Sequence, residues 1–184
     1  MRVIAGSARS LRLKTIEGNE TRPTTDRIKE TLFNMLNPYI PGSRFLDLFA
    51  GSGGIGIEAL SRGASEAVFI DNNKKCVDCI KANLKFTKLE YRASVYNTTA
   101  LSAVSMMDDE DPFDVIFLDP PYDNLFEKDV LYALDDSEIV DEDTIIIVEA
   151  SKETDFDYVE EETDFEVYKE KVYKTNKHVF IRKK

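Results

Sequence analysis

Short apolar runs alternate along the chain with segments whose apolar residues recur at helical spacing. The runs at 44–49, 67–70, 91–96, 113–118 and 144–149 predict strands, and helices are predicted from Gly54 to Ser61 and from the end of the second strand to about Phe86. Strands that alternate with helices favour a mostly parallel sheet with right-handed crossovers and helices on both faces. We therefore expect an α/β, Rossmann-like fold.

The two ends of the chain have different patterns. Residues 2–16 alternate apolar and polar groups around a Gly-Ser pair, which predicts a β-hairpin arm. A helix is expected to begin at the cluster 24–26 and to end before Pro38. Residues 165–173 and 177–182 predict a C-terminal antiparallel hairpin. We expect one domain, 1–184, with an arm (1–20) and a catalytic core (21–184), and we interpret the acidic stretches 108–111, 135–143 and 153–164 as loops or exposed faces.

Charge is unevenly distributed around a net value of −11. Residues 1–29 hold seven basic and three acidic side chains, and residues 169–184 hold seven basic and one acidic, so the middle of the chain is strongly acidic. A phosphate-contacting face at one end is compatible with this distribution, and an all-round basic surface is not. No apolar run approaches the length of a membrane span, and the N-terminus lacks the apolar core of a signal peptide. We expect a cytoplasmic monomer.

A glycine-rich segment follows the first predicted strand and opens the helix after it. Glycines there permit a sharp turn and let a ligand approach backbone amides at a helix N-terminus. Asp71, 20 residues beyond Gly51, suits ribose hydroxyls. The spacing also satisfies the dinucleotide fingerprint, so a nicotinamide cofactor remains an alternative. The expected cofactor-binding residues here are Phe49, Ala50, Gly51, Ser52, Gly53, Gly54, Asp71 and Asn72.

Asp47 lies four residues before the first of these glycines, at the end of the strand. A carboxylate at this point would repel a pyrophosphate, because two like charges 4 Å apart cost about 4 kcal/mol at an effective dielectric constant near 20. The same carboxylate would suit a zwitterionic amino acid with a sulfonium nearby. A helix cap is the structural alternative for Asp47.

The tetrapeptide Asp119-Pro120-Pro121-Tyr122 follows the fourth predicted strand and should face the same crevice as the glycine loop. The carboxylate of Asp119 and the carbonyl of Pro120 are two acceptors that can hold an amino group by both hydrogens. Tyr122 offers a flat face for a base taken out of its stack. This pattern favours methyl transfer to an amine, catalysed by positioning and electrostatic stabilisation.

Over nearly its whole length the chain resembles the bacterial small-subunit ribosomal RNA guanine-N2 methyltransferases, the RsmD family. The segments that carry the resemblance are MRVIAGSARSLRL, TRPTTDRIKETLFNML, LDLFAGSGGIGIEALSRGA, IFLDPPY and YKTNKHVFIRKK. The resemblance implies a Rossmann-like methyltransferase fold, S-adenosyl-L-methionine as cofactor and 16S ribosomal RNA or the small ribosomal subunit as partner. It further implies that Asp47 to Gly54 bind the methionine portion, that Thr24 borders the cofactor, and that Arg2, Arg9, Arg12, Arg22 and Thr25 contact RNA.

One position departs from the family pattern. Where the family usually has an acidic residue that contacts the adenine amino group, this chain has Thr99, whose hydroxyl is also an acceptor. This departure leaves a non-enzymatic binding module open, and DNA adenine or protein glutamine stays an alternative acceptor. Cys76 and Cys79 form an isolated C-x-x-C, which we interpret as two helix cysteines and not as a metal site.

Overall fold

The computed structural model describes residues 1–16, 25–121 and 126–184. Its strands form one seven-stranded sheet in the order β3-β2-β1-β4-β5-β7-β6. The five strands β1 to β5 are parallel, whereas β7 pairs antiparallel with both β5 and β6. The expected α/β fold and the C-terminal hairpin are thereby confirmed. The strands are β1 (Arg44–Asp47), β2 (Glu66–Asp71), β3 (Ala93–Asn97), β4 (Val115–Leu118), β5 (Ile145–Ser151), β6 (Phe165–Val172) and β7 (Asn176–Lys183).

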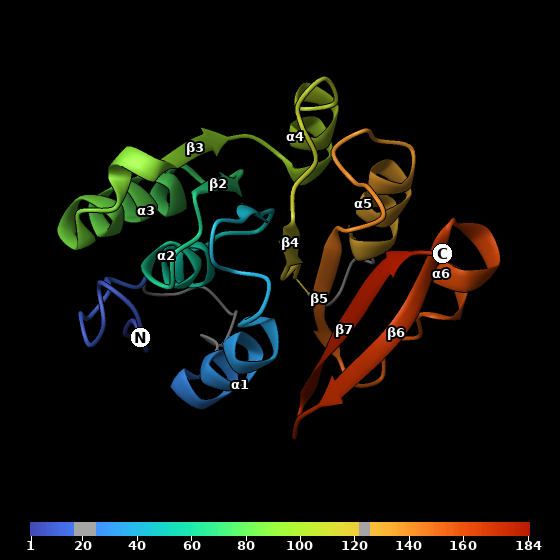
Figure 1. Cartoon of the computed structure of the whole chain (residues 1–184), viewed down its shortest axis with the longest axis horizontal. Helices are drawn as coiled ribbons and strands as arrows, with labels where there is room; N and C mark the ends of the chain where they lie inside the picture. The colour runs from blue at the N-terminus through green and yellow to red at the C-terminus, as the bar shows by residue number, and fades with distance from the viewer. Residues whose placement is uncertain (17–24, 122–125) are drawn as a thin grey trace.

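Helices cover both faces of the sheet, as Figure 1 shows. One face carries α1 (Asp26–Leu36), α2 (Gly54–Ser61) and α3 (Lys74–Thr87), and the other carries α4 (Ala100–Met106), α5 (Phe126–Asp135) and α6 (Asp157–Glu162). Side chains alternate along each strand, so Val115 and Phe117 of β4 enter the first core cluster and Ile116 and Leu118 the second. Each such burial stabilises the fold by about 1.5–3 kcal/mol.

The N-terminal arm is a shorter and less regular hairpin than the alternation over residues 2–16 predicted. The pairing consists of an antiparallel bridge between Arg2 and Arg12, flanked by backbone hydrogen bonds from the Val3 N–H to the Leu11 carbonyl (3.0 Å) and from the Leu13 N–H to the Met1 carbonyl (3.2 Å). The backbone between these segments passes through Gly6 (φ 81°), which lies so close to α2 that a Cβ there would be 1.8 Å from the carbonyl oxygen of Ser61. Val3, Ala8 and Leu13 are buried. Packing against α2 therefore adds to a short stretch of strand pairing.

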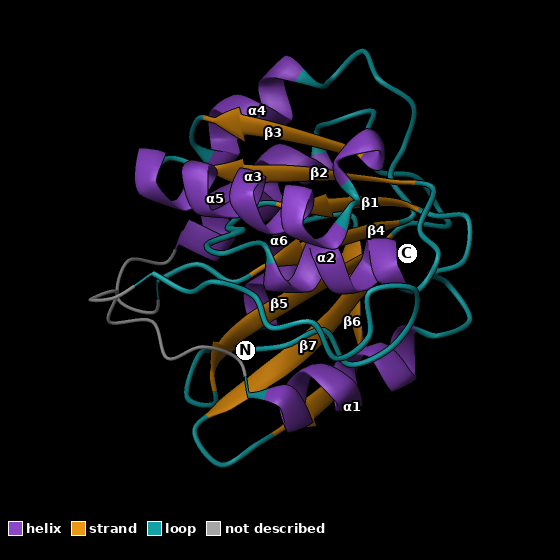
Figure 2. Cartoon of the chain, turned by 90° about the vertical axis from the view of Figure 1, so that its left-hand side faces the viewer, coloured by secondary structure: helices purple, strands orange, loops and turns teal. Residues whose placement is uncertain are grey.

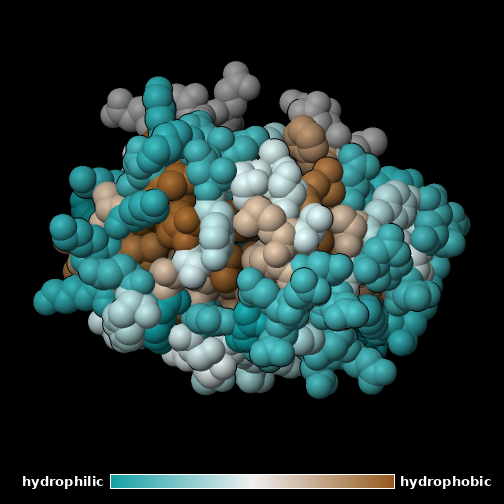
Figure 3. Space-filling model, turned by 90° about the horizontal axis from the view of Figure 1, so that it is seen from above, coloured by the Kyte–Doolittle hydropathy of each residue, from teal (hydrophilic) through white to brown (hydrophobic). Residues whose placement is uncertain are grey.

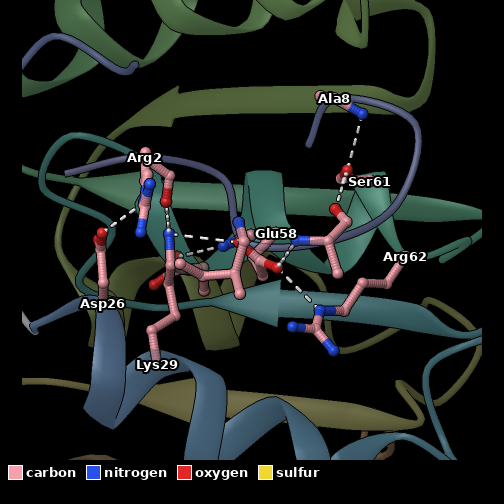
Figure 4. A network of polar contacts seen from close by, with 11 residues as sticks. Arg2, Ala8, Asp26, Lys29, Glu58, Ser61 and Arg62 are labelled. Carbon is pink, nitrogen blue, oxygen red and sulfur yellow. Dashed lines mark hydrogen bonds and ion pairs between the residues drawn. The ribbon is translucent and has the colours of Figure 1, made fainter. Parts of the chain in front are cut away.

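Buried polar contacts attach this arm to α1 and α2, as Figure 4 shows. The Glu58 carboxylate of α2 accepts hydrogen bonds from the backbone N–H groups of Ile4 (2.8 Å) and Ala5 (3.0 Å). It also forms ion pairs with Lys29 of α1 (3.3 Å) and with Arg62 (2.8 Å). The arm is thus bound to α2, the helix that directly follows the glycine loop.

Three segments differ from the sequence expectations. The predicted strand 91–96 begins later, because the 3-10 turn η1 (Glu90–Arg92) precedes β3. Helix α5 was not anticipated. The acidic stretch 153–164 was expected to be a loop or an exposed face, and it contains the helix α6. Val159 of this helix is fully buried against the sheet, and this packing stabilises the helix. In the part of the chain that the structure describes, none of the helices has the length and apolar character that a membrane crossing requires.

Candidate active site

A pocket of about 510 Å³ lies at the carboxyl ends of the parallel strands. The arrowheads of β1, β2 and β3 point to a common edge in Figure 2. Because β1 pairs with β4 on one side and β2 on the other, this edge contains the point where strand order reverses, the usual ligand site of such sheets. Predicted residues that line the pocket are Asp47, Phe49, Ala50, Gly51, Ser52, Gly54, Asp71, Asn72, Thr99, Asp119 and Pro121.

The glycine loop connects β1 to α2 through two left-handed residues. Gly51 has φ 56° and Gly53 has φ 81°, conformations that L side chains rarely adopt. Gly53 is the N-cap of α2 and packs near Ile57 and Ile80, so its part is to shape the turn, and it is not among the residues lining the pocket. At Gly56 a Cβ would be 2.3 Å from the Phe69 ring, so the missing side chain lets α2 approach β2 closely.

Asp47 at the end of β1 caps a helix, which was the structural alternative for this residue, and the cap uses only one of its two oxygens. Its Oδ2 accepts a hydrogen bond from the Gly56 backbone N–H (3.2 Å), which caps the first turn of α2. Its Oδ1 is buried and has no hydrogen-bond partner among the described residues. Burial raises the pKa of Asp47 to about 7, with a smaller contribution from the charge of Asp71. One oxygen therefore serves the fold, and the other is unsatisfied at the pocket.

Asp71 ends β2 and lines the same pocket. Its Oδ2 accepts from the Gly51 backbone N–H (2.9 Å) and its Oδ1 from that of Asn73 (2.8 Å). Each carboxylate oxygen keeps further acceptor capacity, so these contacts fix the side chain and leave room for two ligand hydroxyls. Asn73 in turn caps α3 through its side chain.

Asp119 follows β4 and lines the pocket together with Pro121. Its side chain is half-buried, and the pKa of its carboxyl lies well above the ordinary value because of burial, then the charge of Glu149, then that of Asp47. Pro120, between Asp119 and Pro121 in the sequence, is buried and does not line the pocket. Tyr122, the fourth member of the motif, lies outside the described residues.

Thr99 lines the pocket and at the same time caps α4. Its hydroxyl accepts from the Ser102 backbone N–H (3.2 Å) and lies 2.9 Å from the Ser102 hydroxyl. One lone pair of Thr99 remains for a ligand. The predicted cofactor residue Thr24 lies outside the described residues.

Of the residues predicted to contact RNA, the four that the structure describes are not among those lining the pocket. Arg2 forms an ion pair with Asp26 (2.8 Å), and Thr25 caps α1 by accepting from the Ile28 backbone N–H (3.3 Å). Arg9 and Arg12 are exposed on the arm. Arg22 lies outside the described residues.

Several pocket residues were not expected from the sequence. Met1, Thr15 and Ile16 bring the N-terminal arm to the pocket, and Cys76 and Phe126 reach it from α3 and α5. Of these five residues, only Cys76 had a sequence pattern, its helical spacing, that could have pointed to the pocket. The positions of the other four depend on packing between distant segments. Phe126 is also 41% exposed. Figure 3 shows the surface from above relative to Figure 1, and brown apolar side chains are visible there between hydrophilic ones.

The residues present fit S-adenosyl-L-methionine better than a dinucleotide. Asp47 already occupies the Gly56 amide near the start of α2, where a pyrophosphate would otherwise bind, and its unsatisfied oxygen suits a cationic group. Asp71 lines the pocket with acceptor capacity that hydroxyl groups of a ligand require, and the pocket volume lies in the ordinary range for small-molecule sites. No group of three or more metal-ligating side chains that could hold an ion occurs within residues 1–16, 25–121 and 126–184.

Solved structures with the same fold identify the class of protein. The structure of "Putative methyltransferase yhhF" from Escherichia coli matches with a TM-score of 0.84 and 31% identity, over 100% of this chain and 97% of that chain. The sheet and its crevice are therefore those of a Rossmann-like methyltransferase. More narrowly, the chain belongs to the family described as "Conserved hypothetical protein 95", whose model matches residues 1–182.

Relatives of known name agree with this placement. The chain is 46% identical over 156 residues to "Putative rRNA methyltransferase YlbH" of Bacillus subtilis, covering 84% of this chain and 85% of the relative. It is 38% identical over 154 residues to "Ribosomal RNA small subunit methyltransferase D" of Haemophilus influenzae, covering 83% and 80%. The family resemblance drawn from the sequence is confirmed.

Proposed function

We propose that this chain is an S-adenosyl-L-methionine-dependent methyltransferase that methylates the exocyclic N2 amine of a guanine in 16S ribosomal RNA. The observation that carries the proposal is that Asp47 and Asp119, at the ends of neighbouring strands, line the same pocket as the glycine loop. Relatives named as ribosomal RNA methyltransferases support the substrate class.

The protein's part in the reaction is to hold both reactants. Asp47 with the loop 49–54 would hold the methionine portion of the cofactor, and Asp71 its ribose hydroxyls. When bound, the cofactor supplies a methyl group activated by its sulfonium. Asp119 accepts a hydrogen bond from the acceptor amine, which orients the nitrogen lone pair and stabilises the positive charge that develops on nitrogen.

Methyl transfer from labelled S-adenosyl-L-methionine to undermethylated small ribosomal subunits tests the proposal. We expect label in one nucleotide of 16S ribosomal RNA, identified as N2-methylguanosine by mass spectrometry. Double-stranded DNA and a glutamine-containing peptide, offered in the same reaction, cover the alternative acceptors. Label in adenine of DNA or in glutamine, or cofactor binding without any transfer, would overturn the assignment.

A further inference from the structure

Three ionisable side chains stand in one row across β4, β5 and β7. Leu118 of β4 pairs with Val148 of β5, so Asp119 and Glu149 follow at matching positions on parallel strands. Glu149 in turn pairs with His178 across the antiparallel β5–β7 register. The three therefore project from the same face of the sheet, beginning at the pocket.

The outer members of the row are buried and bonded to one another. Glu149 is 4% exposed and His178 is fully buried. His178 Nε2 lies 3.1 Å from Glu149 Oε2, and the Asn176 side-chain amide donates to Glu149 Oε1 at 2.6 Å. His178 Nδ1 lies 3.2 Å from the hydroxyl of Tyr173. Both carboxylate oxygens of Glu149 thus have a partner on the C-terminal hairpin.

We propose that Glu149, held in place by His178 and Asn176, is a positioning residue that makes Asp119 the acceptor of the proton released by the methylated amine. The proposal rests on the proposed function. As the amine nitrogen forms its bond to the methyl carbon, the carbon–sulfur bond breaks and leaves its electron pair on sulfur. The proton of one N–H bond then passes to the Asp119 carboxylate, and the bonding pair stays on nitrogen as its lone pair.

The physical reason is the charge that surrounds Asp119. Asp47 on β1 and Glu149 on β5 face it from the two neighbouring strands, and burial together with these two charges raises the pKa of Asp119. The further groups that face Glu149 are His178 on β7 and Tyr173 at the turn before it. A carboxylate surrounded in this way is a stronger base than one in water, which suits removal of a proton from an ammonium product.

The matched variants are Glu149→Gln, which removes the charge and keeps the shape, and Glu149→Asp, which restores the charge. Carbon-13 NMR of the carboxyl groups in the free protein gives the titration of Asp119 without any substrate. We expect the Asp119 midpoint to fall by about 1 pH unit in Glu149→Gln and to return toward the native value in Glu149→Asp. Glu170→Gln, which changes the partner of Lys177 on the same hairpin, should leave it unchanged.

The pH profile of kcat/KM provides the second readout. Because Asp119 stays ionised to lower pH in Glu149→Gln, the acidic limb should move to lower pH by a similar amount, while the rate on the plateau falls about tenfold because the base is weaker. His178→Gln retains an amide donor toward Glu149 and should behave more like the native protein than His178→Leu does.

These outcomes separate the inference from the proposed function. An unmoved Asp119 midpoint in Glu149→Gln, or a reduced rate with an unmoved acidic limb, would overturn the role of Glu149 even if methyl transfer to RNA is found. If the midpoint moves but the native protein transfers no methyl group to RNA, the proposed function fails, and with it the role of Asp119 as the proton acceptor.

Discussion

The chain buries charge in two places and balances it differently in each. Beneath the N-terminal arm, the Glu58 carboxylate has two cationic partners, Lys29 and Arg62, and two backbone N–H donors. At the carboxyl ends of the strands, the carboxyl groups of Asp47 and Asp119 line one pocket, and Asp47 has an oxygen without a partner among the described residues. The first cluster is satisfied by the fold, whereas the second is not.

This difference indicates what each cluster does. Buried charges that are paired and hydrogen-bonded stabilise the fold, because removing one partner leaves the other buried without a counter-charge. Unsatisfied buried carboxylates destabilise the empty protein, so a ligand that supplies positive charge and donors gains affinity there. We therefore assign the arm cluster to stability and the crevice to function, and the following variants test that assignment.

The largest expected effect is on stability at the arm. Lys29→Met removes a buried cation, whose pKa burial already lowers, and leaves Glu58 with less compensation. The free energy of unfolding should fall by about 3–5 kcal/mol. Urea denaturation measures it. Lys74→Met, which breaks an exposed pair with Asp78, is the control and should cost less than about 0.5 kcal/mol. Equal losses in the two variants would contradict the structural reading.

Asp119→Asn should have the opposite profile. The rate of methyl transfer should fall roughly 10²–10³-fold, because the acceptor amine loses the charge that stabilises it. The free energy of unfolding should not fall, since a buried repulsion is removed. Single-turnover kinetics and urea denaturation on the same preparation provide both values. The exposed Asp129→Asn serves as the control for rate. A destabilised variant with a normal rate would reverse the assignment.

Asp47→Asn tests the crevice through the pH dependence of stability. The pKa of Asp47 is raised from 3.8 in the unfolded chain to about 7 in the fold, so its stabilising contribution is complete below pH 4 and is lost as the pH rises through 7. Between pH 4 and pH 8, the free energy of unfolding of the native protein should fall by roughly 2–4 kcal/mol relative to that of the variant. Unfolding midpoints in urea across this range measure the difference. A difference that does not change with pH would show that Asp47 is already satisfied.

The smallest effect is expected from charges that belong to neither cluster. Arg9→Ser and Arg12→Ser remove exposed cations from the arm, and each should weaken RNA binding a few-fold and lower the salt dependence of log K by about 1. Filter binding of 16S ribosomal RNA at several salt concentrations measures both quantities. Lys85→Ser on α3 is the matched control. An unchanged salt dependence in the arm variants would remove the arm from the RNA interface.

Much of the crevice follows from local sequence and one topological rule. Residues that directly follow parallel strands meet at the same edge of the sheet, so Asp47, Asp71 and Asp119 were expected to lie together, and they line one pocket. The loop at 51–54 was expected at the same edge because it connects a predicted strand to a predicted helix. These predictions needed only the order of the elements.

Other features depend on contacts between distant segments. The close approach of Gly6 to Ser61 packs the hairpin arm against α2, and no local pattern encodes that packing. The same arm brings Met1 to the pocket. His178 had the pattern of an ordinary hairpin residue, because its pairing with Glu149 requires β7 to insert between β5 and β6. The helix α6 was missed because its acidic composition concealed a single buried apolar contact at Val159.

Asp47 Oδ1 has no hydrogen-bond partner among the described residues, and we expect the bound cofactor to supply a cationic one. Carbon-13 NMR titration of the Asp47 carboxyl, with and without S-adenosyl-L-methionine, tests this directly. We expect a midpoint near pH 7 in the free protein, set by burial, and a midpoint below the ordinary range when the cofactor is bound. A midpoint that is already low in the free protein, or that does not move on saturation with the cofactor, would contradict it.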